Sequence, residues 1–333
     1  MAVTINDIAS HLGISKSTVS KALNNASDVS TETKQLIMHT AVEMGYIVKK
    51  IRQCPKVCIF IENMDYQNPN QFGYGIVSGF RKMAEAENWT VDVHAVTPDF
   101  QHVNAYDFFM MREGYQASFV LGFTLLDPWM AEFHQTRFPT VLYDNYIKDN
   151  PNVASVGCDS AEGFELAVRH LVKLGHQKIG LISGPLASYI LEARYQAYLA
   201  AMKKFDLEVK EDYIGLGYYV SESTKTYVPK LYEQGVTAIL CSHDIRAISA
   251  MTECSDRNIR VPEDISIVGF DDLPIAAACN PPLTTVRQDR IALGKCAYYT
   301  MTSLLNDVPI GSILLRAPLI IRNSTGPVPV PRE

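Results

Sequence analysis

Charged and polar side chains follow three segments that read as buried strands. Asp144 ends TVLYD, Asp271 ends SIVGFD, and His243 and Asp244 follow AILCS, while Arg194 lies in the helical segment after ISGP. Carboxylates beside an imidazole or a guanidinium could act as general acids and bases, as in hydrolysis. The same groups could instead hold the hydroxyl groups of a small ligand through paired hydrogen bonds. Both kinds of chemistry stay open on these residues alone.

The motifs that accompany common enzymatic chemistries are missing from the sequence. It contains no GxxxxGK[ST] phosphate loop, no GxSxG and no HExxH. The glycines of GYGIVSG, residues 73–79, lie in a helical pattern and have the wrong spacing for a dinucleotide-binding loop. We therefore expect no enzyme, no catalytic residue and no cofactor, with a hydrolase as the enzymatic alternative.

The cysteines give no sign of a metal centre or a disulfide framework. There are seven, and only Cys54 and Cys58 lie close together in the sequence. No second pair and no histidine cluster completes a set of ligands. We expect reduced thiols that pack as small apolar side chains, and no metal.

The elements that must position the strand-end residues alternate along the chain from Lys56 onward. The strand-like segments are KVCIFI, TVDVHAV, ASFVLGF, TVLYDN, KIGLISG, TAILCS and ISIVGFDD. The helical segments are QFGYGIVSGFRKMAEAEN, GFELAVRHLVKLGH and about 188–205, 221–234 and 245–257. Such alternation predicts parallel sheets covered on both faces, in two doubly wound subdomains because one sheet cannot hold so many units. Ligands of such folds bind at the carboxyl ends of strands, here in a cleft between the subdomains.

The first fifty residues predict three short helices. Thr4 can cap the first helix with Asp7 three residues on, Gly13 can end it, and Ser15 and Ser30 can cap the next two. Residues at helical spacing predict the buried faces: Ile5, Ile8, Ala9, Leu12, Val19, Ala22, Leu23, Leu36, Ile37, Ala41 and Met44. Two helices joined by a short turn with glycine form a helix-turn-helix.

The second of these helices has an exposed face suited to a polyanion. Lys16, Ser17, Lys21 and Asn24 share it, with Thr18 and Ser20 nearby, and no acidic residue lies between Ser15 and Asn24. Residues 1–56 hold seven Lys and Arg against four Asp and Glu, whereas the rest of the chain is acidic. A basic helix can bind phosphates and donate to guanine edges, although a solvated face on a helical hairpin is the plain alternative.

The segments TINDIASHLGISKSTVSKALNN and VSTETKQLIMHTAVEMGY resemble the DNA-binding head of the lactose-repressor (LacI/GalR) family of bacterial transcription regulators. The resemblance covers residues 4–46 and implies that Ser15, Lys16, Ser17 and Lys21 read the operator. The full set of expected DNA-binding residues is Thr4, Ser15, Lys16, Ser17, Thr18, Lys21, Asn24, Lys49 and Lys50.

The segments RHLVKLGHQKIGLISGP, RVPEDISIVGFDDLPIA and NPPLTTVRQDR resemble the effector-binding core of the same family, which is similar to periplasmic sugar-binding proteins. Residues 62–76 and 98–135 share only the general alternation of strands and helices. The expected effector-binding set is Phe72, Tyr74, Asp144, Arg194, Tyr219, His243, Asp271 and Gln288. Within it, the resemblance implies an aromatic platform at Tyr219, and His243 replaces the Asn more usual in the family.

Several of these residues and their neighbours have a plainer structural alternative. Arg194 could pair with Glu192 or Glu165 on the surface, and Asp272 could cap a helix. His243 could be a pocket donor or only a strand-end residue. The aromatic residues near 72 could belong to the core.

The expected fold is an all-α helix-turn-helix head plus an α/β body of two doubly wound, periplasmic-binding-protein-like subdomains. Residues 1–46 would form the head, 47–56 a short basic linker and 57–330 the effector-binding and dimerisation domain. Its N-subdomain would comprise about 57–157 and 286–316, and its C-subdomain about 158–285 and 317–330.

The linker departs from the pattern of the family. Relatives carry a longer segment with Pro-Asn and a short helix whose Leu wedges into the minor groove, whereas Ile47 to Lys56 leave ten residues. A full hinge helix is not expected to fit; we expect the basic residues Lys49 and Lys50 to hold phosphates, with a reduced wedge role for Ile51 as the alternative.

The expected function is a homodimeric DNA-binding regulator, a repressor controlled by a small molecule. Near-palindromic double-stranded operator DNA would be one partner and a sugar or sugar derivative the other. A nucleobase or sugar phosphate acting as corepressor is the alternative, and a sugar-binding receptor without DNA function is a second. Without a secretory signal or an apolar run long enough for a membrane span, we expect a cytoplasmic protein.

Overall fold

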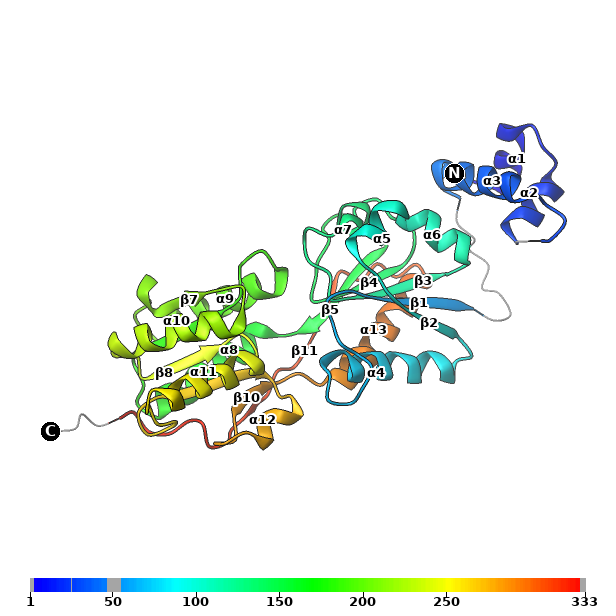
Figure 1. Cartoon of the computed structure of the whole chain (residues 1–333). Coiled ribbons are helices and arrows are strands. Elements are labelled where there is room, and N and C mark those ends of the chain that lie inside the picture. Colours follow the sequence, from blue (N-terminus) through cyan, green and yellow to red (C-terminus); the bar gives the residue numbers. More distant parts are fainter. Residues whose placement is uncertain (1–2, 25, 47–54, 330–333) are drawn as a thin grey trace. The chain divides into compact units, whose positions relative to one another are not determined.

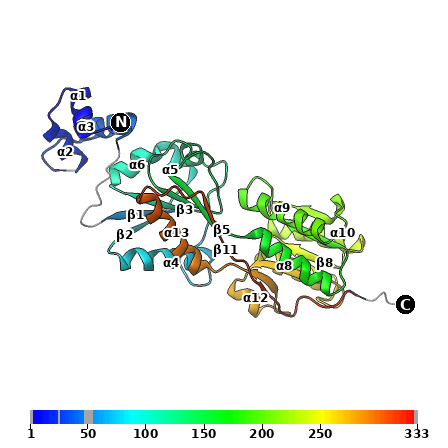
Figure 2. The same ribbon diagram turned by 180° about the vertical axis from the view of Figure 1, so that it is seen from behind.

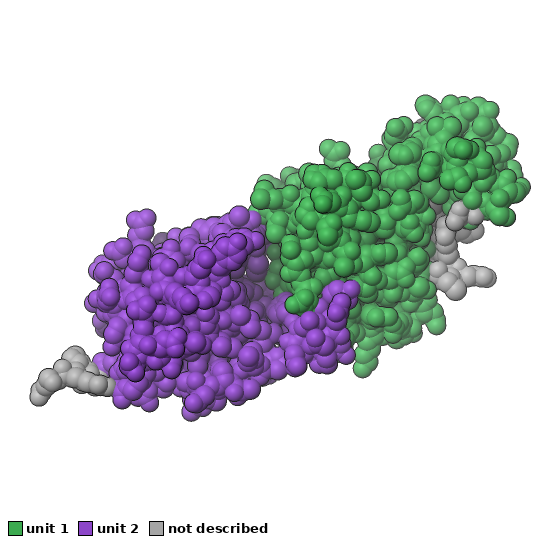
Figure 3. Space-filling view, viewed as in Figure 1, with its two compact units in different colours: residues 1–65, 76–156, 294–313 green, residues 66–75, 157–293, 314–333 purple. Residues whose placement is uncertain are grey.

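The computed structural model describes residues 3–24, 26–46 and 55–329 of the chain (Figure 1). The chain divides into two compact units, each of which contains one six-stranded sheet, and the helical head belongs to unit 1. Unit 1 comprises Met1–Asp65, Ile76–Val156 and Gly294–Ile313, and unit 2 comprises Tyr66–Gly75, Gly157–Leu293 and Leu314–Glu333 (Figure 3).

The head consists of α1 (Ile5–Leu12), α2 (Lys16–Leu23) and α3 (Thr31–Met44). The predicted caps are confirmed, because Thr4 and Asp7 form a reciprocal capping box and the Oγ of Ser15 accepts from a main-chain N–H of the next helix. Gly13 ends α1 with a φ of 65°, a left-handed conformation that glycine adopts at little cost.

The head has an apolar core to which all three helices contribute. Ile8, Val19, Ala22, Ile37 and Ala41 have no exposed surface. The prediction for Leu36 is wrong, because 57% of its side chain is exposed. Positions i, i+4 and i+7 share a helix face, so Ile37, Ala41 and Met44 point inward and the residue before Ile37 points elsewhere.

The sheet of unit 1 has the strand order β11-β5-β4-β3-β1-β2. Its strands are β1 (Lys56–Ile61), β2 (Thr90–Ala95), β3 (Ala117–Leu121), β4 (Thr140–Tyr143), β5 (Val153–Cys158) and β11 (Ser312–Leu315). Its helices are α4 (Phe72–Ala86), α5 (Pro98–Val103), α6 (Tyr106–Glu113), α7 (Pro128–Glu132) and α13 (Arg290–Leu305), although the first turns of α4 and α13, residues 72–75 and 290–293, belong to unit 2. The pairs from β2 through β5 are parallel, as the alternation of strands and helices predicts.

The sheet of unit 2 has the order β12-β10-β9-β8-β6-β7. Its strands are β6 (Ile179–Ser183), β7 (Ile214–Leu216), β8 (Ala238–Cys241), β9 (Ser266–Asp271), β10 (Thr284–Arg287) and β12 (Leu319–Ile320), the last antiparallel to β10. Its helices are α8 (Ser160–Lys173), α9 (Tyr189–Lys204), α10 (Val220–Glu233), α11 (Asp244–Asp256) and α12 (Pro274–Ala278), with a 3₁₀ turn at Glu211–Tyr213.

Helices cover both faces of the sheet in unit 2 (Figures 1 and 2). Side chains of α8 and α9 pack on one face, which includes Leu181 and Leu240. Side chains of α10 and α11 pack on the other, which includes Ile182 and Ile239. Because successive residues of a strand point to opposite faces, this arrangement requires continuous apolar strands and leaves only their ends for polar groups.

The boundaries between the units differ from the expected ones. The chain crosses between units at 156/157, 293/294 and 313/314, rather than near 157, 286 and 316, and residues 66–75 also belong to unit 2. The largest difference arises because β10 pairs with β9 and β12, which keeps the chain in unit 2 up to α13.

The described residues contain neither a membrane-spanning helix nor a cluster of metal-binding side chains. None of their helices has the length and apolar character needed to cross a membrane. Across 3–24, 26–46 and 55–329, no three His, Cys, Asp or Glu side chains gather in a way that could hold a metal ion.

Candidate functional site

Helix α2 presents a basic, hydroxyl-rich face to solvent. Lys16, Ser17 and Lys21 are exposed, whereas Val19 and Ala22 on the opposite side are fully buried in the head core. The fold therefore brings three of the predicted DNA-binding residues onto one accessible face. Such a face can donate hydrogen bonds to phosphates and to base edges.

Four other predicted DNA-binding residues also shape the helix ends. Thr4 caps α1, as described above. The Oγ of Ser15 accepts from the N–H of Thr18 at 3.1 Å and lies 2.8 Å from the Oγ1 of Thr18. Asn24 ends α2, and its Nδ2 donates to the carbonyl of Ser20 at 2.8 Å. These side chains stabilise the presentation of α2, and their contact with DNA stays a prediction.

Lys21 has an acidic partner that the sequence did not reveal. Its Nζ lies 2.5 Å from the Oδ2 of Asp28, in the turn before α3, and the two side chains are 51% and 55% exposed. This hydrogen bond, together with the nearby charge of Lys34, holds the pKa of Asp28 below its usual value. Seven positions separate the two residues, so no local pattern predicts their pairing.

The linker residues Lys49, Lys50 and Ile51 lie outside the described residues. Their predicted roles as phosphate contacts and reduced wedge therefore stay predictions.

In unit 2, Arg194, Asp271 and Gln288 form a buried cluster at the carboxyl end of β9. The Nη2 of Arg194 lies 3.6 Å from Asp271 Oδ1, and Gln288 Nε2 donates to the same oxygen at 2.7 Å. Arg194 also donates to the carbonyl of Ser242 and lies over the ring of Phe270, 4.0 Å from its centroid. Burial raises the pKa of Asp271, and the charge of Arg194 opposes this shift.

The backbone is strained where β9 ends. Asp271 has a φ of 119° and Asp272 a φ of 51°, conformations that cost free energy in any residue but glycine. The carboxylate of Asp272 lies 2.6 Å from both Arg287 and Arg322. Asp272 is therefore an ion-pair partner, and the alternative of a helix cap is wrong because Leu273 is the residue that precedes α12.

The surface pairing considered for Arg194 is also wrong. Only 5% of Arg194 is exposed, and its ion-pair partner is Asp271. Glu165 instead pairs with Lys204 at 2.7 Å, and Glu192 accepts from Gln196 at 2.8 Å.

His243 caps α11. Its Nδ1 accepts from the main-chain N–H of Arg246 at 3.2 Å, so the neutral ring carries its proton on Nε2. Burial, together with the charges of Arg246 and Arg194, lowers the pKa of His243 to about 3. The ring is therefore neutral at pH 7 and has one donor for a further partner.

Asp244 is a buried carboxyl group with a structural role, and it is not exposed for contact with a ligand. It has no exposed surface, and it accepts from the N–H of Leu273 at 2.7 Å and from Thr285 Oγ1 at 2.5 Å. Burial and the neighbouring carboxyl of Asp271 raise its pKa. Asp244 thus joins α11, α12 and β10 around the end of β9.

A hollow of about 480 Å³ in unit 2 contains two of the predicted effector residues, Tyr74 and Gln288. Its lining consists of Pro69, Tyr74, Gly75, Asp272, Arg287, Gln288, Asp289, Arg290 and Ile291. One guanidinium nitrogen of Arg290, Nη1, is buried without a hydrogen-bond partner among the described residues. Gln288 connects this hollow to Asp271 and hence to Arg194.

The remaining predicted effector residues are less closely associated. Tyr219 precedes α10, is 63% exposed and contacts Tyr218 with 5.0 Å between ring centroids. Phe72 is half-buried at the start of α4. Asp144 follows β4 in unit 1 with a φ of 52°, and its N–H donates to the carbonyl of Val156. Their effector roles stay predictions.

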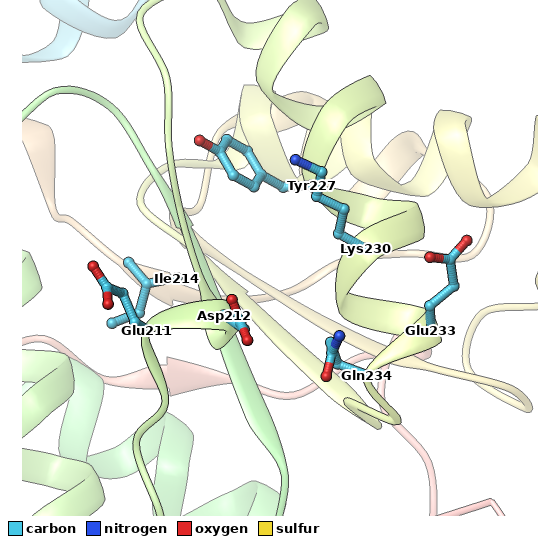
Figure 4. A pocket seen from close by; sticks show the side chains of 7 residues that line it. All are labelled: Glu211, Asp212, Ile214, Tyr227, Lys230, Glu233 and Gln234. Carbon is cyan, nitrogen blue, oxygen red and sulfur yellow. The ribbon is translucent and has the colours of Figure 1, made fainter.

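A second hollow of about 190 Å³ in unit 2 lies away from these residues. Figure 4 shows Glu211 and Asp212 on one side of it and Lys230 and Glu233, from α10, on the other. Its lining consists of Glu211, Asp212, Ile214, Tyr227, Lys230, Glu233 and Gln234, which include no predicted effector residue.

Two family models match the chain. Residues 4–48 match the bacterial regulatory proteins of the lacI family, and residues 168–325 match the periplasmic binding protein-like domain. The HTH-type transcriptional repressor CytR of Escherichia coli strain K12 is 28% identical over 337 residues, covering 98% of each chain.

Solved structures share the fold. A regulatory protein of the LacI family from Chloroflexus aggregans is 27% identical, with a TM-score of 0.70 over 81% of this chain and 98% of that one. The lac repressor dimer bound to operator and the anti-inducer ONPF is 24% identical, with a TM-score of 0.68 over 98% and 100% of the two chains.

Proposed function

Since the chain belongs to the lacI family of bacterial regulatory proteins, we propose that it represses transcription by binding operator DNA under the control of a small effector. The observation that carries this proposal is the exposed face of Lys16, Ser17 and Lys21 on α2, held by a buried head core. Repression is supported by CytR, a named transcriptional repressor that matches 98% of the chain.

The DNA contact would use α2 as the helix that enters the major groove. Phosphate contacts from the head would supply affinity that falls as salt rises, and side chains of α2 would select the sequence. One three-helix head makes few contacts, so two copies acting on a near-palindrome are the expected binding species.

The effector would bind at the carboxyl ends of the strands in unit 2, beside Arg194, Asp271 and Gln288. The carboxylate of Asp271 lies 3.6 Å from the guanidinium of Arg194 and accepts a hydrogen bond from the amide of Gln288, and such a set of groups suits the paired hydroxyls of a sugar or sugar derivative. A nucleobase or sugar phosphate acting as corepressor is the alternative ligand. No chemical change of the ligand is part of this function, and its site of action would be the cytoplasm.

The proposal is tested by selecting DNA from a random library with the full chain and measuring its affinity for the selected sequence. Tight binding should depend on Lys16 and Lys21 and weaken steeply with salt. A thermal-shift screen of sugars, nucleosides and sugar phosphates then identifies the effector, because a ligand of the folded state raises Tm. Failure to select any sequence from the library would refute the DNA-binding role.

A further inference from the structure

Arg246, in the first turn of α11, carries a buried guanidinium group. Only 2% of the residue is exposed. Its guanidinium donates to Ser223 Oγ and, at 3.2 Å, to the carbonyl of Gly217, but in the part of the chain that the structure describes no carboxylate lies within 4.0 Å of it. A buried charge that lacks a counter-ion costs free energy, and this cost is recovered when an anion binds.

Arg246 lies near the predicted effector residues. It reaches the carboxyl end of β6, since a Cβ on Gly184 would lie 3.6 Å from its Nη2. Arg194 donates to the carbonyl of Ser242, at the end of the adjacent strand β8. The charges of both guanidinium groups contribute to lowering the pKa of His243.

Unused hydrogen-bond donors surround the same strand ends. Ser183 and Ser242 are the residues directly after Ile182 and Cys241, the last pair in the β6–β8 register. Neither serine has any exposed surface. Their hydroxyls, like the Nε atoms of Arg194 and Arg246, have no hydrogen-bond partner among residues 3–24, 26–46 and 55–329. Donors that a fold leaves unpaired in its interior are the groups that a ligand acceptor can satisfy.

The carboxyl groups nearby do not offset both cations. Asp271 is shared by Arg194 and Gln288. Asp244 accepts from Leu273 and Thr285, and its raised pKa favours the neutral form. His243 is neutral and holds a proton on Nε2. The strand ends thus combine two guanidinium charges with several donors, and of these two cations Arg194 alone has an ion pair, with Asp271, in the described part of the chain.

From this combination we propose that the effector carries an anionic group, a carboxylate or a phosphate, that binds at the ends of β6 and β8 beside Arg194 and Arg246. The inference rests on the proposed function, because it assumes that the effector occupies this edge of unit 2. It narrows the ligand class to sugar acids, sugar phosphates and related hydroxylated anions, since guanidinium and hydroxyl donors match the oxygens of both groups.

The test uses the full chain and chemically matched probes. Glucose 6-phosphate is compared with glucose, ribose 5-phosphate with ribose, gluconate with sorbitol, and inorganic phosphate is added alone. We expect at least one anionic probe to raise Tm and to change the affinity for the selected operator, whereas its neutral partner does neither at the same concentration. If none of the anionic probes raises Tm, the proposal is overturned.

Two substitutions at Arg246 distinguish an effect of its charge on ligand binding from a purely structural effect of its hydrogen bond to the loop that carries Gly217. Arg246→Met should weaken the anionic probe at least ten-fold, and Arg246→Lys, which keeps the charge, should weaken it less. The control is Arg257→Met at the far end of α11, where Arg257 pairs with Glu253. If the Met and Lys variants lose the same affinity for the anionic probe, or if neutral and anionic ligands lose the same affinity, Arg246 has a structural role only. Either result would overturn the proposal.

The outcomes also distinguish this inference from the proposed function. If a neutral sugar alters operator affinity and no anionic probe does, the proposal that the effector is anionic is refuted. Control of DNA binding by an effector would still stand. Absence of sequence-specific DNA binding in the unliganded and the liganded protein would instead refute the proposed function itself.

Discussion

The Nζ of Lys21 lies 2.5 Å from the Oδ2 of Asp28, so a residue expected to read DNA is paired with an acid of its own head. The pair joins α2 to the turn before α3, and both side chains are about half exposed. DNA that recruits Lys21 must separate it from Asp28, and the carboxylate must then lie near the phosphates. Asp28 therefore lowers the affinity for DNA of any sequence. The loss is smallest for sequences in which Lys21 gains a base contact, so Asp28 increases selectivity.

Asp28→Asn should increase affinity for DNA of any sequence by a few-fold and reduce selectivity. Removing one negative charge and releasing Lys21 should also steepen the dependence on salt by about one phosphate contact. Fluorescence anisotropy on selected and scrambled duplexes at several salt concentrations measures both effects. Asp256→Asn, at an exposed site on α11, is the control, and lower affinity for scrambled DNA in the Asp28 variant would contradict the prediction.

Lys16→Ala and Lys21→Ala should each weaken binding to the selected operator by about ten- to one-hundred-fold, the range typical of a lost base contact. Binding to scrambled DNA should change much less, and ligand affinity should not change. Lys210→Ala, which removes an exposed lysine of unit 2, should leave DNA binding unaltered. Intact operator binding in both head variants would show that α2 does not read the sequence.

Arg194→Ala should abolish the response to the effector while the unliganded protein still binds its operator. The substitution removes the ion-pair partner of Asp271 and a donor to the carbonyl of Ser242. Because a buried carboxylate is left without its cation, Tm should also fall. Asp271→Asn retains an acceptor for Gln288 and serves as the companion variant. Induction or corepression that persists in both variants would contradict the assignment of this cluster.

Acidification should destabilise the protein through His243. The folded ring stays neutral down to a pKa of about 3, whereas in the unfolded chain it takes up a proton near its ordinary value of 6.5. The unfolded state thus binds more protons between these values, and stability falls as pH drops below 6.5, by about 2 kcal/mol at pH 5. His243→Asn, which can still cap α11, should reduce this loss in denaturant titrations, and His134→Asn at an exposed site should not.

Gly122→Ala should lower the free energy of unfolding by about 1–3 kcal/mol or more, and hence Tm by several degrees. Gly122 has a φ of 76°, and an added Cβ would lie 1.8 Å from the carbonyl oxygen of Glu62. Gly311→Ala provides the matched control, because a Cβ added there would meet no atom within 4 Å and its φ is not left-handed. Equal Tm values for the two variants would argue against close packing between the ends of β1 and β3.

The head was predictable from the sequence because its signals are local. Caps at Thr4, Ser15 and Ser30, a glycine at 13 and helical spacing define three helices without any knowledge of distant residues. Leu36 failed because one apolar residue beside a buried stripe looks the same in sequence as a member of it. The pairing of Lys21 with Asp28 was missed because it depends on the path of the turn between helices.

The body was predictable in its strand–helix alternation and less so in its details. The short helices α5, α6 and α7 and the edge strands β11 and β12 carry too few residues for a clear period. The assembly of Arg194, Asp271 and Gln288 was anticipated from resemblance, since their sequence separation reveals no contact. Arg246 was missed because a lone arginine in a helix normally lies in solvent, and only the fold shows that it is buried.

The interleaving of the two units imposes an order on synthesis. The edge strand β11 and most of the helix α13, from residue 294 onward, are made after residues 157–293 of unit 2. A ribosome that has just finished β5 therefore carries a sheet in which β5, an inner strand of the finished sheet, is still an exposed edge, which is a hazard for association between nascent chains. Completion of the first sheet must wait until almost the whole polypeptide has emerged, so a premature stop anywhere before β11 leaves that sheet incomplete.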